Sequence, residues 1–255
     1  NMIIDTHAHV YLEDFDEDAS LIIERAATEN VEQILLPNID MSSVDRLLGL
    51  CDKHSQIYKP MIGLHPCYVK EDYNDQLAQL KKYLDREDIV AVGEIGIDLY
   101  WDKTFEKEQI QAYKTQIEWS KEKSLPFVIH SRESLDLTIS IVEKMQDGHL
   151  KGVFHCFNGT SEQAQRIMDV GFYMGIGGVV TFKNAGVDKT VAKLPMEYLV
   201  VETDAPYLSP VPYRGLRNEP SYVSKVVDKI AEVKEMDRAE VCKLTTENAR
   251  KLFSL

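Results

Sequence analysis

Cysteines are few in this sequence and long apolar runs are missing, and each absence excludes a class of protein. The four cysteines are far apart and form no Cys-x-x-Cys pair, so neither a zinc ribbon nor a disulfide framework is indicated. We therefore expect a protein of the reducing cytoplasm. No run of about 18 uncharged apolar residues is present, and no basic segment followed by an apolar one stands near the start, so we expect neither a membrane span nor a targeting signal.

Positive charge is also in short supply. The chain has 29 Lys and Arg against 42 Asp and Glu, a formal net charge of -13. This balance repels polyanions at long range and argues against a protein that grips duplex DNA over a broad basic face. If a nucleic acid is the substrate, the contact must be local and assisted by a metal ion.

The length favours one domain with a large core. The chain has 255 residues, of which 44% are hydrophobic, and this is close to the usual length of an eight-stranded α/β barrel. No low-complexity stretch, linker or fixed-period repeat divides it. We expect a single domain over residues 2–255 and a monomer. Asn1 precedes Met2, and we expect it to lie outside the native chain.

Eight short runs rich in apolar and β-branched residues predict eight strands. Segments with helical spacing lie between them, for example around Leu21–Ala26 and Leu77–Leu84. An alternation of strands and helices predicts a parallel sheet, and consecutive apolar positions indicate strands buried on both faces. Strand number and chain length favour a (β/α)8 TIM-type barrel over a doubly wound sheet. The predicted strands are Met2–Thr6, Gln33–Pro37, Lys59–Leu64, Ile89–Glu94, Pro126–His130, Gly152–His155, Phe172–Gly177 and Tyr198–Glu202.

The C-terminal part begins with an irregular segment. Four prolines stand within Ala205–Pro220, and at that density they prevent a regular helix or strand. We expect a stiff loop after the last strand, followed by helices around Ser221–Lys234 and Arg238–Phe253.

Residues that can bind metal or activate water stand at the ends of most of these strands. In a (β/α)8 barrel the carboxyl ends of the strands converge on one face, so residues far apart in sequence meet there. The scattered side chains therefore predict one site. They are His7, His9, His65, Glu94, His130, His155 and Asp204.

The first strand ends in Asp-Thr-His-Ala-His. A strand's period of two directs His7 and His9 to the same side, where they form a chelating pair, and Asp5 on that side can orient them as a supporting carboxylate. The alternative is a pair of ordinary surface histidines. Asp204 follows the eighth strand, which neighbours the first in a closed barrel, so it can be a ligand or the base for a bound water.

Glu94 stands at the end of an apolar strand between two glycines. A buried carboxylate needs a strong partner, and one or two metal ions would supply it; the alternative is a salt bridge to a barrel arginine. His130 and His155 each end a buried run. A lone histidine at such a place is more often structural, but two at equivalent places beside the other candidates favour metal binding.

Together these residues resemble the TatD family of metal-dependent deoxyribonucleases. The resemblance runs from Met2 to Phe253. It rests on His7-x-His9, Gly63-x-His65-Pro66, Gly93-Glu94-Ile95-Gly96-Ile97-Asp98, His130-Ser131-Arg132, His155-Cys156-Phe157-Asn158-Gly159, Glu202-Thr203-Asp204-Ala205-Pro206-Tyr207-Leu208 and Arg214-Gly215-x-Arg217-Asn218-Glu219-Pro220.

The resemblance implies a TIM-type barrel of the amidohydrolase superfamily, one to three metal ions and hydrolysis of nucleic-acid phosphodiesters. It makes His7, His9, Glu94, His130, His155 and Asp204 the metal ligands, with Glu94 bridging two ions. It turns His65, Arg132, Arg214 and Arg217 toward the substrate phosphate. Leu216 stands where the family often has a basic residue, which leaves one cation fewer for holding a polyanion.

We therefore expect a metal-dependent deoxyribonuclease, a 3′–5′ exonuclease on single-stranded DNA, that binds DNA at the barrel mouth and uses two divalent ions. Imidazole and carboxylate ligands suit zinc, manganese, nickel or iron better than magnesium, although a weak magnesium site can act in turnover. Asp204 and Glu94 are the expected catalytic residues. Four aromatic residues in or near the mouth loops can stack on bases or simply pack the loops: Tyr100, Trp101, Phe157 and Tyr207.

Two alternatives remain open. The same metal centre can hydrolyse a small phosphoester, an amide or lactone, or an aminoacyl ester, since the fold does not choose the bond. A non-catalytic metal-binding protein is the more remote alternative.

Overall fold

The computed structural model of the chain describes residues 1–255 and contains one eight-stranded parallel sheet. Strand order follows chain order, so each strand lies beside the next one in sequence. The expected (β/α)8 barrel is confirmed. The strands are β1 (Ile3–Asp5), β2 (Val31–Leu36), β3 (Tyr58–Ile62), β4 (Ala91–Asp98), β5 (Phe127–Arg132), β6 (Gly152–Phe154), β7 (Tyr173–Ile176) and β8 (Leu199–Val201).

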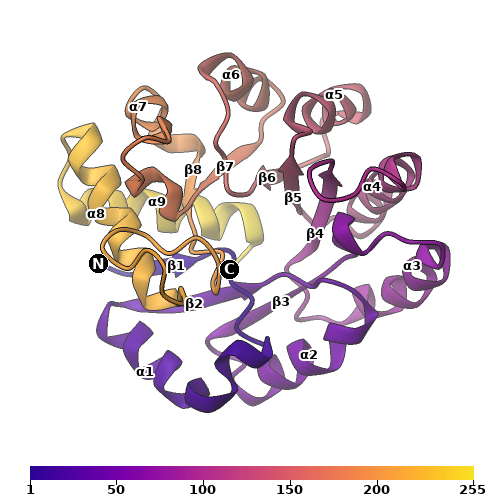
Figure 1. Ribbon diagram of the computed structural model, residues 1–255, viewed down its shortest axis with the longest axis horizontal. Coiled ribbons are helices and arrows are strands. Elements are labelled where there is room, and N and C mark those ends of the chain that lie inside the picture. The colour runs from indigo at the N-terminus through magenta and orange to yellow at the C-terminus, as the bar shows by residue number, and fades with distance from the viewer.

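Helices alternate with the strands, and Figure 1 shows α1 to α8 arranged around the outside of the sheet. Their buried faces pack on the strands in a core cluster of 56 buried residues. The helices are α1 (Ala19–Thr28), α2 (Val44–Lys53), α3 (Tyr73–Lys81), α4 (Glu106–Lys123), α5 (Leu135–Met145), α6 (Ser161–Asp169), α7 (Val187–Ala192), α8 (Val223–Lys234) and α9 (Arg238–Phe253). None of them is both long and apolar enough to cross a lipid bilayer.

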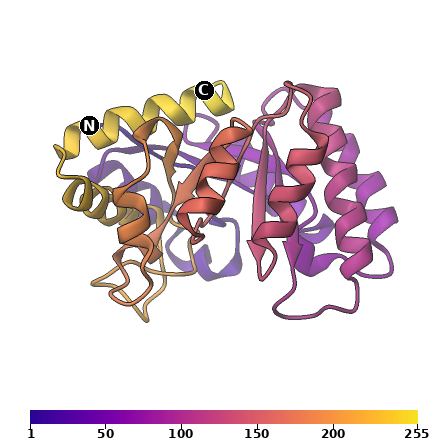
Figure 2. The ribbon, with the colours of Figure 1, turned by 90° about the horizontal axis from the view of Figure 1, so that it is seen from above.

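A second, smaller core fills the inside of the barrel. It contains buried side chains from seven of the eight strands, such as Ile4, Leu35 and Met61, together with Leu252 and Phe253 of α9. Because α9 lies against the amino-terminal end of β1, where Thr246 donates a hydrogen bond to the Met2 carbonyl, it covers that end of the barrel (Figure 2). The opposite end, formed by the carboxyl ends of the strands, is left for the loops and the polar side chains.

The barrel closes between β8 and the residues that follow β1. Asp204 donates its backbone N–H to the His7 carbonyl at 2.8 Å, and Ala8 and Ala205 form an isolated parallel bridge. Asp5 reinforces this seam, since its carboxylate accepts hydrogen bonds from the Thr203 backbone and hydroxyl at 3.0 and 2.6 Å. The chelating pair after β1 and Asp204 after β8 are therefore fixed side by side.

All eight predicted strands form, but most of their predicted ends differ from the observed ones by one or two residues, and the end of β4 differs by four. The sequence prediction ended the fourth strand at Glu94 and the fifth at His130, whereas β4 continues to Asp98 and β5 to Arg132. The two strands keep pairing as far as Asp98 and Arg132, so polar side chains are carried inside the sheet. The proline-rich loop and both C-terminal helices are found, with α8 beginning at Val223.

We expect Asp5 to stabilise the barrel seam through its hydrogen bonds. Asp5→Ala leaves buried donors of Thr203 and His7 without an acceptor, which lowers the free energy of unfolding by about 3 kcal/mol. Burial raises the pKa of Asp5 to about 8, so the neutral Asn in Asp5→Asn is a close mimic and costs less than about 1 kcal/mol. Denaturant unfolding of the metal-free protein measures the free energy of unfolding of both variants. An equal decrease in Asp5→Ala and Asp5→Asn would contradict this role.

Candidate metal centre

Glu94 lies at the centre of the polar side chains at the carboxyl end of the barrel. Its carboxylate is 2% exposed. Five imidazole nitrogens lie within 3.5 Å of its two oxygens, and no arginine or lysine pairs with it, so the alternative of a barrel salt bridge is wrong. The partners are His7 Nε2 at 3.1 Å, His9 Nε2 at 3.5 Å, His65 Nε2 at 3.3 Å, His130 Nδ1 at 3.0 Å and His155 Nε2 at 3.0 Å.

Glycine lets the strands carrying these groups approach closely. Gly96, with φ of +145°, lies against β5, and a Cβ at this position would overlap the carbonyl oxygen of His130. Gly63, after β3, has the backbone of Gly93 within 3.0 Å of where its Cβ would be. Larger residues would push β3 and β5 away from β4, and with them His65 and His130.

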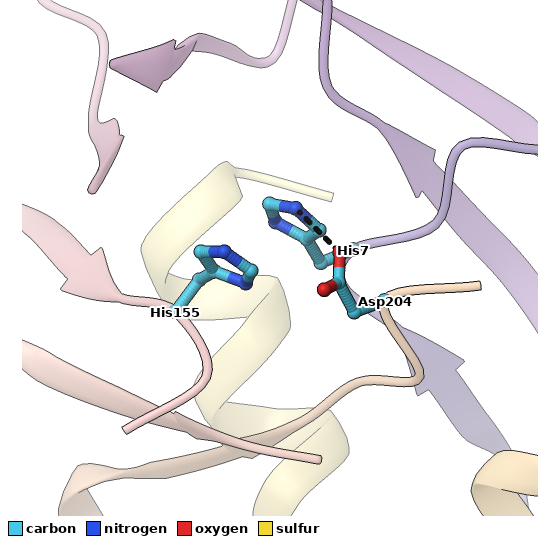
Figure 3. A group of neighbouring side chains, drawn as sticks. All are labelled: His7, His155 and Asp204. Carbon is cyan, nitrogen blue, oxygen red and sulfur yellow. Dashed lines mark ion pairs between the residues drawn. The ribbon is translucent and has the colours of Figure 1, made fainter. Parts of the chain in front are cut away.

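Asp204 completes the cluster on the β8 side. Its Oδ1 lies 3.5 Å from His7 Nε2 and 3.4 Å from His9 Nε2. Figure 3 shows Asp204 beside the His7 ring, with the His155 ring lying parallel to it. The two rings are stacked with centroids 3.7 Å apart and an interplanar angle of 2°. The structure thus brings together all six residues predicted as metal ligands.

The donor atoms of these residues suit divalent cations. Three groups of side chains each have ligand atoms within 4.8 Å of one another: His7, His155 and Asp204; His7, His9 and Glu94; and His65, Glu94 and His130. The Nδ1 of His7 is the only buried side-chain nitrogen or oxygen without a hydrogen-bond partner. Imidazole and carboxylate donors at this density fit zinc, manganese, nickel or iron.

His65 lies closer to the cluster than a role in substrate binding alone requires. It was expected to face substrate, yet its Nε2 belongs to the third of these donor groups. Its ring is held in place because Nδ1 accepts a hydrogen bond from the Cys67 backbone at 3.1 Å. His65 can therefore donate to a metal as well as border the substrate cleft.

Two carboxylates that sequence reasoning missed hold the histidine rings. Asp98 Oδ2 lies 2.8 Å from His130 Nε2, and Glu202 Oε1 lies 3.2 Å from His155 Nδ1. Both carboxylates are buried. A carboxylate on the far nitrogen fixes the orientation of an imidazole and makes it a better ligand. The available signal was the period of two, which puts Asp98 on the side of Glu94 and Glu202 on the side of Asp204.

Asp5, predicted as the carboxylate that orients His7 and His9, acts on the backbone instead. It accepts a hydrogen bond from the His7 N–H at 3.2 Å and touches neither imidazole ring. His9 is held by the Tyr11 hydroxyl, 2.9 Å from its Nδ1.

The metal-free cluster holds protons. Burial opposes the charged form of His9, but hydrogen bonds to Asp204 and Glu94 raise its pKa to about 9. Burial acts likewise on His155, whose pKa is raised well above its usual value by Glu202 and Glu94. Burial and the charge of His155 lower the pKa of His7. Metal binding must therefore displace protons from His9 and His155.

The three arginines expected to face phosphate have different surroundings. Arg132 lies over the Tyr100 ring at 3.9 Å and Arg214 over the Phe182 ring at 3.7 Å, and neither forms an ion pair. Arg217 makes two hydrogen bonds to the Asp18 carboxylate, at 2.9 and 2.7 Å. Its guanidinium is already paired, so we expect it to hold the proline-rich loop rather than to bind phosphate.

The aromatic residues expected at the mouth also differ in how far they are exposed. Trp101, Tyr100 and Tyr207 are 69%, 51% and 50% exposed, whereas Phe157 is 4% exposed and belongs to the core. Of the two roles considered for these rings, base stacking and loop packing, Phe157 has the packing role. Its backbone N–H donates to the Gly175 carbonyl of β7.

Comparisons with known proteins agree on one family. The family model described as TatD related DNase matches residues 4–254. The uncharacterized metal-dependent hydrolase YabD of Bacillus subtilis (strain 168) is 40% identical over 255 residues, which cover 100% of both chains. The crystal structure of YjjV, a TatD homolog from Escherichia coli K12, has a TM-score of 0.94 at 29% identity, covering 99% of this chain and 98% of the other.

A more distant structure shares the fold. The hydrolase of the TatD family from Entamoeba histolytica has a TM-score of 0.86 at 22% identity, over 99% of this chain and 98% of that one.

We expect metal binding to release protons. Because the pKa of His9 is raised to about 9 and that of His155 is raised too, affinity for zinc or manganese should increase as the pH rises from 6 toward 9. Calorimetric titration at one pH in two buffers of different ionisation enthalpy should show release of about one to two protons per chain. Heats that do not depend on the buffer would contradict the protonated state of these histidines.

Proposed function

The chain belongs to the TatD-related DNase family of metal-dependent hydrolases, and we propose that it is a deoxyribonuclease that shortens single-stranded DNA from its 3′ end. The observation that carries this proposal is the surface around the ligand cluster. Two of the three arginines expected to face phosphate lack an acidic partner and lie at the carboxyl end of the barrel, each against an aromatic ring: Arg132 is the last residue of β5, and Arg214 lies in the loop after β8.

An aromatic cleft opens directly above the cluster. It has a volume of about 640 Å³, and Glu94, His130 and Asp204 line it. Tyr68, Trp101 and Tyr207 also line it; we call this space the aromatic cleft. Exposed rings beside a phosphate-binding centre suit unpaired bases, which stack without regard to sequence. A paired duplex keeps its bases covered, so these rings favour a single strand.

The arginines supply local positive charge in an acidic protein. Arg132 lines the aromatic cleft, and a guanidinium can donate two hydrogen bonds to one phosphate edge. The ring under each guanidinium limits its freedom, so less entropy is lost on binding. With a net charge of -13, this contact has to be local, as the sequence indicated.

We propose that His7, His9, Glu94, His130, His155 and Asp204 hold two divalent ions. When bound, the ions would lower the pKa of water and stabilise negative charge on the phosphate. Asp204, whose pKa is held below its usual value by His9, His155 and His7 against the opposing effect of burial, is ionised at neutral pH. It can accept the proton of the attacking water as the water oxygen bonds to phosphorus and the bond to the leaving oxygen breaks; that oxygen then takes up a proton.

A second candidate is hydrolysis of a small phosphoester by the same residues. Leu216, at 63% exposure, stands in the loop between Arg214 and Arg217, so no continuous row of cations extends along the loop. A substrate with a single phosphate would need only Arg132 and the ligand cluster.

The test is hydrolysis of a 5′-labelled single-stranded oligonucleotide by metal-stripped protein with Mg²⁺, Mn²⁺ or Zn²⁺ added back. We expect no cleavage without metal and a ladder shortened from the 3′ end with it. Glu94→Gln keeps the size of the side chain but removes its charge, and it should lower kcat by on the order of 10³-fold. Circular dichroism should show the barrel intact.

Cleavage of a small phosphoester but of no DNA would replace the proposed function with the second candidate. Full activity of Glu94→Gln would remove the site assignment.

Arg132 and Arg217 should respond differently to the same substitution. Arg132→Gln removes a charged phosphate contact and should lower kcat/KM on DNA by about 10- to 100-fold with little change in stability. Arg217→Gln breaks the pair with Asp18; it should lower the melting temperature but change kcat/KM by less than about threefold. Steady-state kinetics and thermal unfolding on both variants test this, and a reversed pattern would return Arg217 to the substrate.

A further inference from the structure

A second cleft opens on the other half of the barrel mouth. It has a volume of about 760 Å³, within the range of about 300 to 1,000 Å³ that holds small ligands. The aromatic cleft is bordered by residues following β1 to β4 and by Tyr207 and Leu208, whereas this cleft is bordered mainly by loops following β5, β6 and β7. Figure 1 shows these two groups of strands on opposite sides of the barrel.

The two clefts meet over the ligand cluster. His130, Arg132, Asp204 and Leu208 line both. A phosphodiester held at the cluster would therefore have one neighbouring nucleoside in each cleft. Arg132 stands at the boundary, where it can reach the phosphate between them.

The second cleft has a different chemistry from the first. Its lining includes no tyrosine or tryptophan and instead carries polar groups: Ser131, Glu133, Asp136, Asn158 and Gln163. We call it the polar cleft. Its hydroxyl and amide groups can form hydrogen bonds with a sugar and with the edges of a base.

The charge of the polar cleft opposes a second phosphate. Arg132 is its only lysine or arginine, and it lies at the boundary. Asp136 forms an ion pair with Arg166, whose Nη1 lies 3.1 Å from Asp136 Oδ1. Arg166 does not line the cleft. Glu133 forms no ion pair, so its charge is uncompensated. A phosphate beyond the first nucleoside would meet this like charge without a cation to offset it.

The rest of a DNA strand fits the aromatic cleft better. Apart from the carboxylates of the ligand cluster and its support, Glu94, Asp204 and Asp98, no acidic side chain lines that cleft. Three exposed rings there can take successive bases.

Resting on the proposed nuclease function, we propose that the polar cleft holds the single terminal nucleoside that is removed and excludes a further phosphate. The enzyme then releases mononucleotides and discriminates against a strand whose attacked end carries a phosphate. Glu133 is the residue that sets this discrimination.

The experiment compares short oligothymidylates that end in either a hydroxyl or a phosphate, placed at the 3′ end in one pair and at the 5′ end in another. We expect a phosphate at the attacked end to lower kcat/KM by about tenfold and a phosphate at the other end to have no effect. Glu133→Gln should reduce this ratio to about threefold, and Glu133→Lys should abolish it. Mononucleotides should be the first products of the wild-type protein.

Glu162 provides a matched control, because it is exposed in the first turn of α6 and lies outside the polar cleft. Glu162→Gln and Glu162→Lys change the net charge by the same amounts as the corresponding Glu133 variants. They should keep the wild-type ratio of kcat/KM between hydroxyl-ended and phosphate-ended strands.

Three results would overturn the inference without contradicting the nuclease function. They are equal rates on strands whose attacked end carries a hydroxyl or a phosphate, dinucleotides as first products, and the same effect from Glu162→Lys as from Glu133→Lys. If no strand is cleaved with any metal, the proposed function fails and this inference fails with it.

Discussion

The burial of one carboxylate among five imidazoles governs the carboxyl end of this barrel. An ionised Glu94 at 2% exposure would be too costly without strong partners. One partner, His130, lies in β5, and the other four lie in the segments directly after β1, β3 and β6. These segments must therefore place their histidines at the same level along the barrel axis. The glycines on β4 and after β3 let neighbouring strands approach, while Asp98 and Glu202 keep the rings turned toward Glu94.

Along the barrel axis, the apolar residues that stabilise the fold lie at one end and the polar residues of the candidate site lie at the other. Apolar side chains from seven strands fill the interior next to α9, and the polar cluster occupies the opposite end. Asp5 lies between the two regions and holds β8 to the end of β1. A barrel of this kind can vary its loops, and so its substrate, without rebuilding the residues that we propose as metal ligands.

Much of this could be predicted from the sequence because a barrel obeys local rules. Continuous apolar runs give strands buried on both faces, and parallel strands bring their carboxyl ends together, so His7, Glu94 and Asp204 could be placed in one site before any coordinates. The ends of β4 and β5 could not be placed, because pairing between these strands continues beyond the last apolar residue. Strand ends depend on the neighbour as well as on the chain itself.

Loop residues were the least predictable. Arg214 and Arg217 are three residues apart in one motif, yet one lies over Phe182 and the other is paired with Asp18, nearly 200 residues away in the chain. Phe157 and Tyr207 are both aromatic residues after strands, but only Tyr207 is exposed. Such differences arise from long-range contacts that no local pattern encodes.

The central claim to test is that Glu94 and the histidines around it hold divalent ions. Anomalous diffraction from crystals of the metal-loaded protein, recorded at the absorption edge of manganese or zinc, measures it most directly. We expect metal peaks beside the Glu94 carboxylate, with histidine ligands from both sides of the cluster. Ions bound only by His7, His155 and Asp204, with Glu94 out of reach, would contradict it.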